Sequence, residues 1–309
     1  MARGQLQKVM SIQSKAKVKV RDDPSANLRV AVRVRPVLKS GVRASEATQK
    51  DIMRVLNGNV VKVEDPDEEK LYLDKVQGRT KEKMYTYDVA CDQQSTNLDI
   101  FNRTIQDMCL GCMEGRSVTV FAYGATGSGK TYTMVGTEQD PGLMVRSLER
   151  VFQAKEDIAD EDVALTCSYI EVYNEVVYDL LVAHSGALDL REDPKQGVCV
   201  AGIKRHAVST PREIMSLLQE GNRRRKTDAT GANATSSRSH AVLEIRVTRK
   251  RLGAKGKPKM GKLCLVDLAG SERASETDNM GQKLRDGANI NKSLLALANC
   301  INALGKAAQ

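Results

Sequence analysis

Residues 124–131 read Gly-Ala-Thr-Gly-Ser-Gly-Lys-Thr and directly follow an apolar run from Ser117 to Tyr123. A glycine-rich turn after an apolar run is typical of a buried strand that leads into a helix. The glycines let backbone N–H groups approach a phosphate closely, and a helix N-terminus favours negative charge. In such a loop Lys130 reaches the β- and γ-phosphates and the Thr131 hydroxyl holds Mg²⁺. The stretch therefore predicts the class of ligand, a nucleoside triphosphate with Mg²⁺, but not the function.

Composition favours a single large globular domain, because the chain has 309 residues of which 41% are hydrophobic. The formal net charge of +9 indicates attraction to a polyanion, which could be a nucleic acid, an anionic membrane or an acidic protein surface. Charge alone does not choose among them. The chain has no Trp and only three Phe, which argues against nucleic-acid binding through the basic connection 249–262.

The seven cysteines are an odd number scattered along the chain, and no secretory leader pattern precedes them. We therefore expect a reduced, cytoplasmic compartment. No apolar run reaches the length that spans a membrane.

Strand and helix patterns alternate along the chain after a basic arm at residues 1–26, so that we expect the folded domain to be residues 27–309. Period-two alternation predicts strands at 28–35 and 240–250, and a strand, a bend at Asn174 and a second strand across 163–181. The mostly apolar run 262–268 suits a strand buried on both faces, and 211–225 suits a helix. These patterns predict an α/β fold with a central, mostly parallel β-sheet flanked by helices on both faces.

Two polar clusters follow the phosphate loop, at 233–240 and 267–272. The first is a serine-rich segment directly before a strand, and the second is Asp-Leu-Ala-Gly-Ser-Glu at the end of one. Taken singly, the first could be an ordinary turn and Asp267 could cap the next helix. In this order after a phosphate loop they indicate segments that hold Mg²⁺ and sense the γ-phosphate.

The chain resembles a kinesin motor domain from about Leu28 to its last residue. The matching motifs are Arg33-x-Arg35-Pro36, the phosphate loop with Tyr132-Thr133-Met134, Ser236-Ser237-Arg238-Ser239-His240, Asp267-Leu-Ala-Gly-Ser-Glu272-Arg273 and Asn289-Ile-Asn291-Lys-Ser-Leu. The resemblance implies the P-loop nucleoside triphosphatase architecture, ATP and Mg²⁺ as ligands, microtubules as the partner, and the microtubule cytoskeleton as the location. The long charged segment 65–83 and the Ala125 variant of the loop are similar to the kinesin-eight class.

Site residues follow from the resemblance. Arg33 and Pro36 match the residues that pack against adenine, with Arg35 adjacent and Tyr87 as a further neighbour. Gly124, Ala125, Thr126, Gly127, Ser128, Gly129, Lys130 and Thr131 match the residues around the phosphates, and Tyr132 directly after them belongs to the same nucleotide-binding set. Thr131 and Ser237 would hold Mg²⁺ directly and Asp267 would hold it through a water, while Gly270 would read the γ-phosphate. Arg238 and Glu272 match a pair that forms a salt bridge when both switch segments close, and Glu272 would accept a proton from the attacking water through a second water.

The microtubule side is expected in a loop at 281–289 and a helix at 290–308. Lys283, Arg285 and Lys292 are the candidate contacts with acidic tubulin, and a solvated face of mixed charge is the competing interpretation. Arg223-Arg224-Arg225-Lys226 closes a predicted helix, where cations complement the helix dipole.

A kinesin motor domain would continue past the last helix, so that we expect Gln309 to precede a missing strand and further helices, and dimerisation to need regions absent here. Microtubule-stimulated ATP hydrolysis is the leading function. A nonhydrolysing tubulin-binding fragment and a different P-loop nucleoside triphosphatase acting on nucleic acid are the alternatives.

Overall fold

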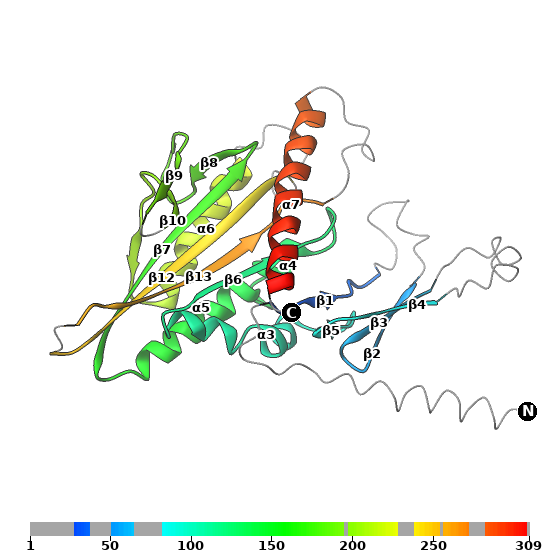
Figure 1. Ribbon diagram of the computed structural model, residues 1–309, viewed down its shortest axis with the longest axis horizontal. Helices are drawn as coiled ribbons and strands as arrows, with labels where there is room; N and C mark the ends of the chain where they lie inside the picture. Colours follow the sequence, from blue (N-terminus) through cyan, green and yellow to red (C-terminus); the bar gives the residue numbers. More distant parts are fainter. Residues whose placement is uncertain are drawn as a thin grey trace, which may run out of the picture.

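The computed structural model describes residues 28–37, 51–64, 82–194, 197–227, 238–253, 256–271 and 282–307. At its centre is a six-stranded sheet in the order β11-β7-β12-β13-β6, with β8 paired to β7 (Figure 1). These strands are β6 (Ser117–Ala122), β7 (Glu161–Tyr173), β8 (Val176–Asp179), β11 (His206–Val208), β12 (Ser239–Arg251) and β13 (Lys259–Asp267).

Smaller sheets surround this centre. Strand β1 (Ala31–Arg33) pairs in parallel with β5 (Val89–Cys91), and β2 (Met53–Leu56), β3 (Val60–Glu64) and β4 (Glu82–Thr86) form an antiparallel sheet. Strands β9 (Leu190–Asp193) and β10 (Gly197–Val200) form a hairpin. The helices are α3 (Asn97–Thr104), the 3₁₀ helix η1 (Met108–Cys112), α4 (Lys130–Met134), α5 (Leu143–Glu156), α6 (Pro211–Thr227) and α7 (Gln282–Ala307).

The prediction of a mostly parallel sheet is wrong. Within the described part of the central sheet only β6 and β13 run parallel, and the other neighbouring pairs are antiparallel. The reason is the length of the connections: β7–β8 and β12–β13 are hairpins, whereas parallel neighbours need a long crossover. The sheet is therefore mixed, and its single parallel pair carries the phosphate loop.

Burial alternates along the central strands as a half-covered sheet requires. In β12 Ala241, Leu243, Ile245 and Val247 are buried, and the helices α3 to α6 pack against this face through Phe101, Leu148 and Ile214 among others. The predicted apolar face of β12 is thus confirmed. In β13 the burial alternates too, so the expectation of a strand fully buried on both faces is wrong and its second face is only half-buried.

Helix α7 lies on the other face of the sheet, because His240, which points away from the buried face of β12, contacts it through Ser293 (Figure 1). Helices on both faces are thus confirmed. The helix begins at Gln282, so the predicted loop at 281–289 is wrong for residues 282–289, where Gln, Lys, Leu and Arg are strong helix formers. The bend at Asn174 is confirmed, since its φ is 51° between β7 and β8.

The basic arm at 1–26 lies outside the described residues. Within those that are described, no helix has the length and apolar character to cross a membrane.

Candidate nucleotide site

The phosphate loop joins β6 to α4 with three glycines at positive φ: 156° at Gly124, 80° at Gly127 and 98° at Gly129. Only glycine adopts such angles freely, and a Cβ at Gly124 would lie 2.6 Å from Ser128 Oγ. Residues 125–128 are exposed, whereas Lys130 is buried and its Nζ donates to the carbonyls of Gly124 and Ala125, both at 2.9 Å. The loop therefore combines a buried cation with an exposed, glycine-rich turn.

Two of the three predicted Mg²⁺ residues, Thr131 and Asp267, meet at the end of β13. The Thr131 hydroxyl donates to Asp267 Oδ2 at 3.0 Å, and Asp267 has no exposed surface. Its other oxygen, Oδ1, is buried and accepts no hydrogen bond from the residues that the structure describes. A buried carboxylate with a spare oxygen beside a hydroxyl is the donor set that Mg²⁺ or its water shell prefers, so these residues fit the metal.

Arg225 is a functional residue that the sequence analysis missed. Its Nη1 donates to Asp267 Oδ2 at 2.9 Å, its Nη2 donates to the Ser239 carbonyl at 2.8 Å, and its Nε lies 3.7 Å from Glu171 Oε1. The side chain is 4% exposed, so this is a buried ion network rather than a surface cation near a helix end.

Strand register explains the position of Arg225. Glu171, Ala241 and Asp267 are direct neighbours across β7, β12 and β13, and their side chains share the helix-covered face. The small Ala241 separates the two carboxylates, and the guanidinium from α6 spans them. A sequence signal existed: the buried positions Ile214, Leu218, Gly221 and Arg225 recur at helical spacing on one face of α6.

The start of the second polar cluster contacts the phosphate loop. The N–H of Ser271 donates to the Gly124 carbonyl at 3.1 Å, the same carbonyl that Lys130 contacts. Gly270 is buried beside it, and Arg238 is half-buried before β12. Ser237 and Glu272 lie outside the described residues, so the predicted pairing of Arg238 with Glu272 stays a prediction.

His240 connects the end of β13 to α7. Its Nδ1 accepts the Ala269 N–H at 3.1 Å, and its Nε2 lies 3.0 Å from Ser293 Oγ. Because Nδ1 accepts a hydrogen bond, the ring proton is on Nε2 and Ser293 is the acceptor. Burial, and then the nearby Arg225 cation, lowers the pKa of His240, and this keeps the ring neutral at pH 7.

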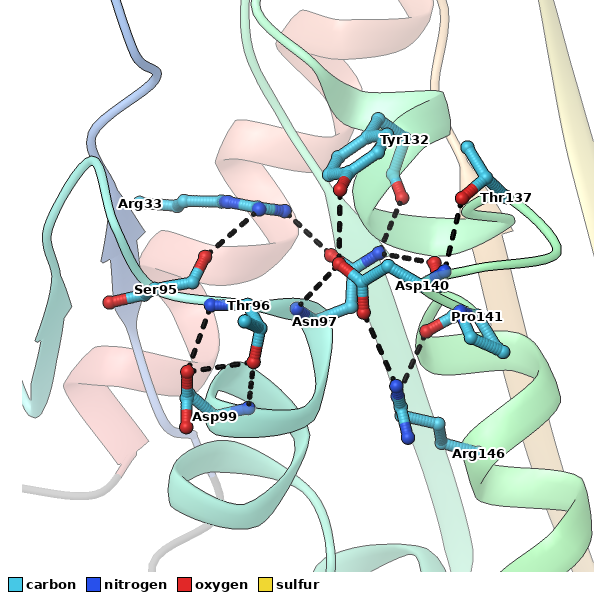
Figure 2. Close-up of polar contacts among 10 residues, drawn as sticks. All are labelled: Arg33, Ser95, Thr96, Asn97, Asp99, Tyr132, Thr137, Asp140, Pro141 and Arg146. Carbon is cyan, nitrogen blue, oxygen red and sulfur yellow. Dashed lines mark hydrogen bonds and ion pairs between the residues drawn. The ribbon is translucent and has the colours of Figure 1, made fainter.

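Two of the expected base-binding residues, Arg33 and Arg35, contact the loop or the helix that follows it, and Tyr132 lies with them although the sequence did not assign it to the base. Tyr87 is half-buried between β4 and β5. The Arg33 guanidinium carbon is 5.1 Å from the centre of the Tyr132 ring, within cation–π range, and both side chains are partly exposed. The Arg35 guanidinium donates to the Gly127 carbonyl, and Pro36 is exposed. Figure 2 shows that Arg33 and Tyr132 are held by a polar network around Asn97 and Asp140, which the sequence analysis did not foresee.

The candidate microtubule contacts are on α7. Lys292 is exposed there, while Lys283 and Arg285 belong to the first turns of the helix, whose side chains are not described.

A family model described as the kinesin motor domain matches residues 33–309. The chain belongs to the kinesin motor domain family. It is 55% identical over 91% of its length to the kinesin-like protein KIN-8B of Arabidopsis thaliana, and 44% identical over 92% to the kinesin-like protein KIF19 of Homo sapiens. The expected similarity to the kinesin-eight class is thereby confirmed.

Solved kinesin structures confirm the fold. A fast kinesin superposes with a TM-score of 0.77 at 33% identity and covers 89% of this chain and 75% of its own. A KIF14 dimer with AMP-PNP in complex with a microtubule gives 0.73 at 34% identity, with 87% of this kinesin and 75% of that chain covered. This kinesin spans 34% of the length of KIN-8B and 28% of KIF19.

Proposed function

We propose that this kinesin domain hydrolyses ATP and uses the energy to move along microtubules or to control their length, as part of a longer protein in the cytoplasmic microtubule cytoskeleton. The observation that carries the proposal is the meeting of Thr131, Arg225 and Asp267 below the phosphate loop. The family supports ATPase chemistry, and the KIF14 structure with AMP-PNP and a microtubule supports the pairing of nucleotide with filament.

Phosphate binding depends first on Lys130. Its Nζ donates to the carbonyls of Gly124 and Ala125, and a charged phosphate oxygen is a stronger acceptor for an ammonium group than a neutral carbonyl. The exposed backbone of Ala125 to Ser128 and the N-terminus of α4 provide further N–H groups for the β-phosphate.

Thr131, Ser237 and Asp267 would hold Mg²⁺, the last through a water molecule. A metal held there would supply positive charge that offsets the negative charge of the phosphates. Arg225 keeps the Asp267 carboxylate in place, because its Nη1 donates a charge-assisted hydrogen bond to Oδ2 at 2.9 Å. The residues at this end of the sheet are therefore oriented before a ligand arrives.

Hydrolysis would be gated by the two switch segments. Gly270 N–H would recognise the γ-phosphate, and the Arg238–Glu272 salt bridge would form when both segments close around it. Glu272 would then accept a proton from the attacking water through a second water. The hydrogen bond from Ser271 to the Gly124 carbonyl supports this, because it keeps the second switch in contact with the loop.

The filament would be sensed through α7, where Lys283, Arg285 and Lys292 would face acidic tubulin. His240 provides a physical link, since one ring contacts both Ala269, beside the γ-phosphate sensor Gly270, and Ser293 on α7. A displacement of either partner changes the geometry of the other bond, so that helix position and nucleotide state become coupled.

The test is ATP turnover by the chain with and without microtubules, together with cosedimentation in ATP and in ADP, at one ionic strength because charge-driven binding weakens with salt. We expect turnover to rise severalfold on microtubules and binding to differ between the nucleotides. Zero turnover with binding that ignores the nucleotide would replace the proposal by a nonhydrolysing tubulin-binding fragment. Turnover that responds to DNA and not to microtubules would replace it by a nucleic-acid motor.

A further inference from the structure

A buried asparagine lies behind the two side chains that flank the proposed base site. Asn97 has no exposed surface and is the first residue of α3. Its Oδ1 accepts Arg33 Nη1 at 2.7 Å, and its Nδ2 donates to the Tyr132 carbonyl at 3.1 Å (Figure 2). One amide group therefore ties the strand that carries Arg33 to the helix that carries Tyr132.

Asp140 holds the same group from the other side. It accepts the Asn97 N–H at 3.1 Å and the Tyr132 hydroxyl at 3.0 Å on one oxygen, and Arg146 Nη2 at 3.2 Å on the other. The Asn97 Nδ2 also donates to the Asp140 carbonyl at 3.0 Å. The Tyr132 ring is thus fixed at both ends, at its backbone by Asn97 and at its hydroxyl by Asp140.

Hydrogen bonds to neighbouring residues of the chain set the positions of Asn97 and Asp140. Thr96 caps α3 through reciprocal bonds with Asp99, and this sets the position of Asn97. Asp140 sits in a tight turn, where its N–H donates to Thr137 Oγ1 at 3.1 Å and its carbonyl accepts the Thr137 N–H at 3.1 Å. The side chains of Arg33 and Tyr132 are therefore positioned in advance, which reduces the entropy lost when a ligand binds.

The charge of Asp140 is part of the arrangement. Burial opposes ionisation, but the hydrogen bonds from Asn97, Tyr132 and Arg146 outweigh it and hold the pKa of Asp140 below its ordinary value. The hydrogen bond to Asp140, and then burial, raises the pKa of Tyr132. The phenol therefore remains a hydrogen-bond donor throughout the neutral range.

We propose that Asn97 and Asp140 are positioning residues for the nucleotide base: they set the spacing and tilt of Arg33 and Tyr132 so that a flat purine ring is held by stacking, and they do not act on the phosphates. The inference rests on the proposed function, because it assumes that a nucleotide occupies the loop. Lys130 donates to the carbonyls of Gly124 and Ala125, and Thr131 donates to Asp267, so these bonds differ from those of Asn97 and Asp140. Arg33 also donates to Thr133, whose hydroxyl donates to the Gly129 carbonyl of the loop.

The test compares a ligand that has the base with one that lacks it. We expect Asn97→Ala to weaken binding of ADP with Mg²⁺ about tenfold, equivalent to about 1.4 kcal/mol, and to leave binding of inorganic triphosphate with Mg²⁺ within about twofold of the unmodified chain. Asn102→Ala is the matched control, since it removes an exposed asparagine from the same helix, and we expect both affinities to be unchanged.

Tyr132→Phe and Asp140→Asn keep the inference testable if Asn97→Ala does not fold, because each changes only part of the network. We expect each to weaken ADP binding about threefold, because Tyr132→Phe loses the hydroxyl hydrogen bond and Asp140→Asn loses the charge that strengthens the bonds from Tyr132 and Arg146. The loss in the double variant should be less than the sum of the two, since both act on the bond between Tyr132 and Asp140. In steady state the loss would appear in KM for ATP and not in kcat.

Three results would overturn the inference. An equal loss of ADP and triphosphate affinity would mean that the network supports the whole nucleotide site. Unchanged ADP affinity in all variants would mean that the network does not position the groups that bind the base. A drop in kcat alone would mean that the network acts in the hydrolysis step. These results differ from failure of the proposed function, in which the unmodified chain itself would bind neither ligand.

Discussion

The two faces of the central sheet differ where β12 and β13 meet the phosphate loop. On the helix-covered face, Asp267 and Glu171 are buried and joined by Arg225 from α6. On the other face, His240, the neighbour of Ala241 on β12, forms a hydrogen bond with Ser293 of α7, where Leu294 is also buried. The described polar contacts of the first face are buried charges whose separation would be costly, whereas the bond between His240 and Ser293 joins neutral groups and contributes about 1 kcal/mol. The difference indicates which part of the site is a fixed frame and which part is able to move.

Removal of the phosphate-binding cation, Lys130, should have the largest effect on ATP turnover. We expect Lys130→Ala to lower ATP turnover by at least about a thousandfold, because no other described side chain supplies a buried cation inside the loop and such groups contribute about 3–4 kcal/mol. Lys257→Ala, in the exposed connection between β12 and β13, is the control and should keep full turnover. Normal turnover by Lys130→Ala would remove the loop from the mechanism.

Substitution of Arg225 tests whether the buried ion network also stabilises the folded state. We expect Arg225→Ala to lower the free energy of unfolding by about 3–5 kcal/mol, because the buried carboxylates of Asp267 and Glu171 lose their shared cation. Chemical denaturation measures this. Arg225→Lys should recover part of the loss, since an ammonium group restores the charge but not the fork of hydrogen bonds.

Arg223 is the matched control two residues earlier on α6. Its side chain is 67% exposed and pairs with Glu220 on the surface. We expect Arg223→Ala to cost less than about 1 kcal/mol. Equal costs for the two arginines would contradict the distinction between a buried network and a solvated helix end.

Gly221 tests how α6 is seated. A Cβ at this position would lie 2.6 Å from Cδ1 of the fully buried Tyr169 ring, one turn before Arg225. We expect Gly221→Ala to cost about 1–3 kcal/mol by overpacking, more than the gain of about 1 kcal/mol in helix propensity. Gly186→Ala, where the added Cβ meets nothing within 4 Å, should change the unfolding free energy by less than about 0.5 kcal/mol.

What the sequence predicted correctly was local. The phosphate loop depends on glycine conformations within eight consecutive residues, and Asp267 ends an apolar run, so both could be placed without knowing the rest of the fold. Strand direction could not be placed in this way, because the pairing of β12 with β7 joins residues such as Leu243 and Tyr169 that are far apart in the chain.

The missed residues follow the same rule. Helical spacing from Ile214, Leu218 and Gly221 puts Arg225 on the buried face of α6, but only the packing of α6 against the sheet shows that it meets Asp267. Asn97 and Asp140 carry no motif of their own, and they meet because α3 and the turn after α4 fold against each other. Motifs indicate the atoms that touch a ligand, whereas the residues that position them are decided by non-local packing.

Substitutions at the contact between β12 and α7 should have the smallest effect on the free energy of unfolding but a measurable effect on microtubule stimulation of ATP turnover. We expect Ser293→Ala to lower microtubule stimulation of ATP turnover about three- to fivefold, because it removes one hydrogen bond of about 1 kcal/mol between His240 and α7. The ratio of turnover with and without microtubules, measured alongside the free energy of unfolding, separates coupling from folding.

His240→Ala sharpens this prediction, because it also removes the acceptor of the Ala269 N–H. If the imidazole couples the two sites, the double variant His240→Ala with Ser293→Ala should lose no more stimulation than His240→Ala alone. The reason is that His240→Ala has already removed the bond to Ser293. Additive losses would mean that α7 responds to the nucleotide through other contacts. The contrast between a rigid ion network on one face of the sheet and a movable contact with α7 on the other would then be wrong.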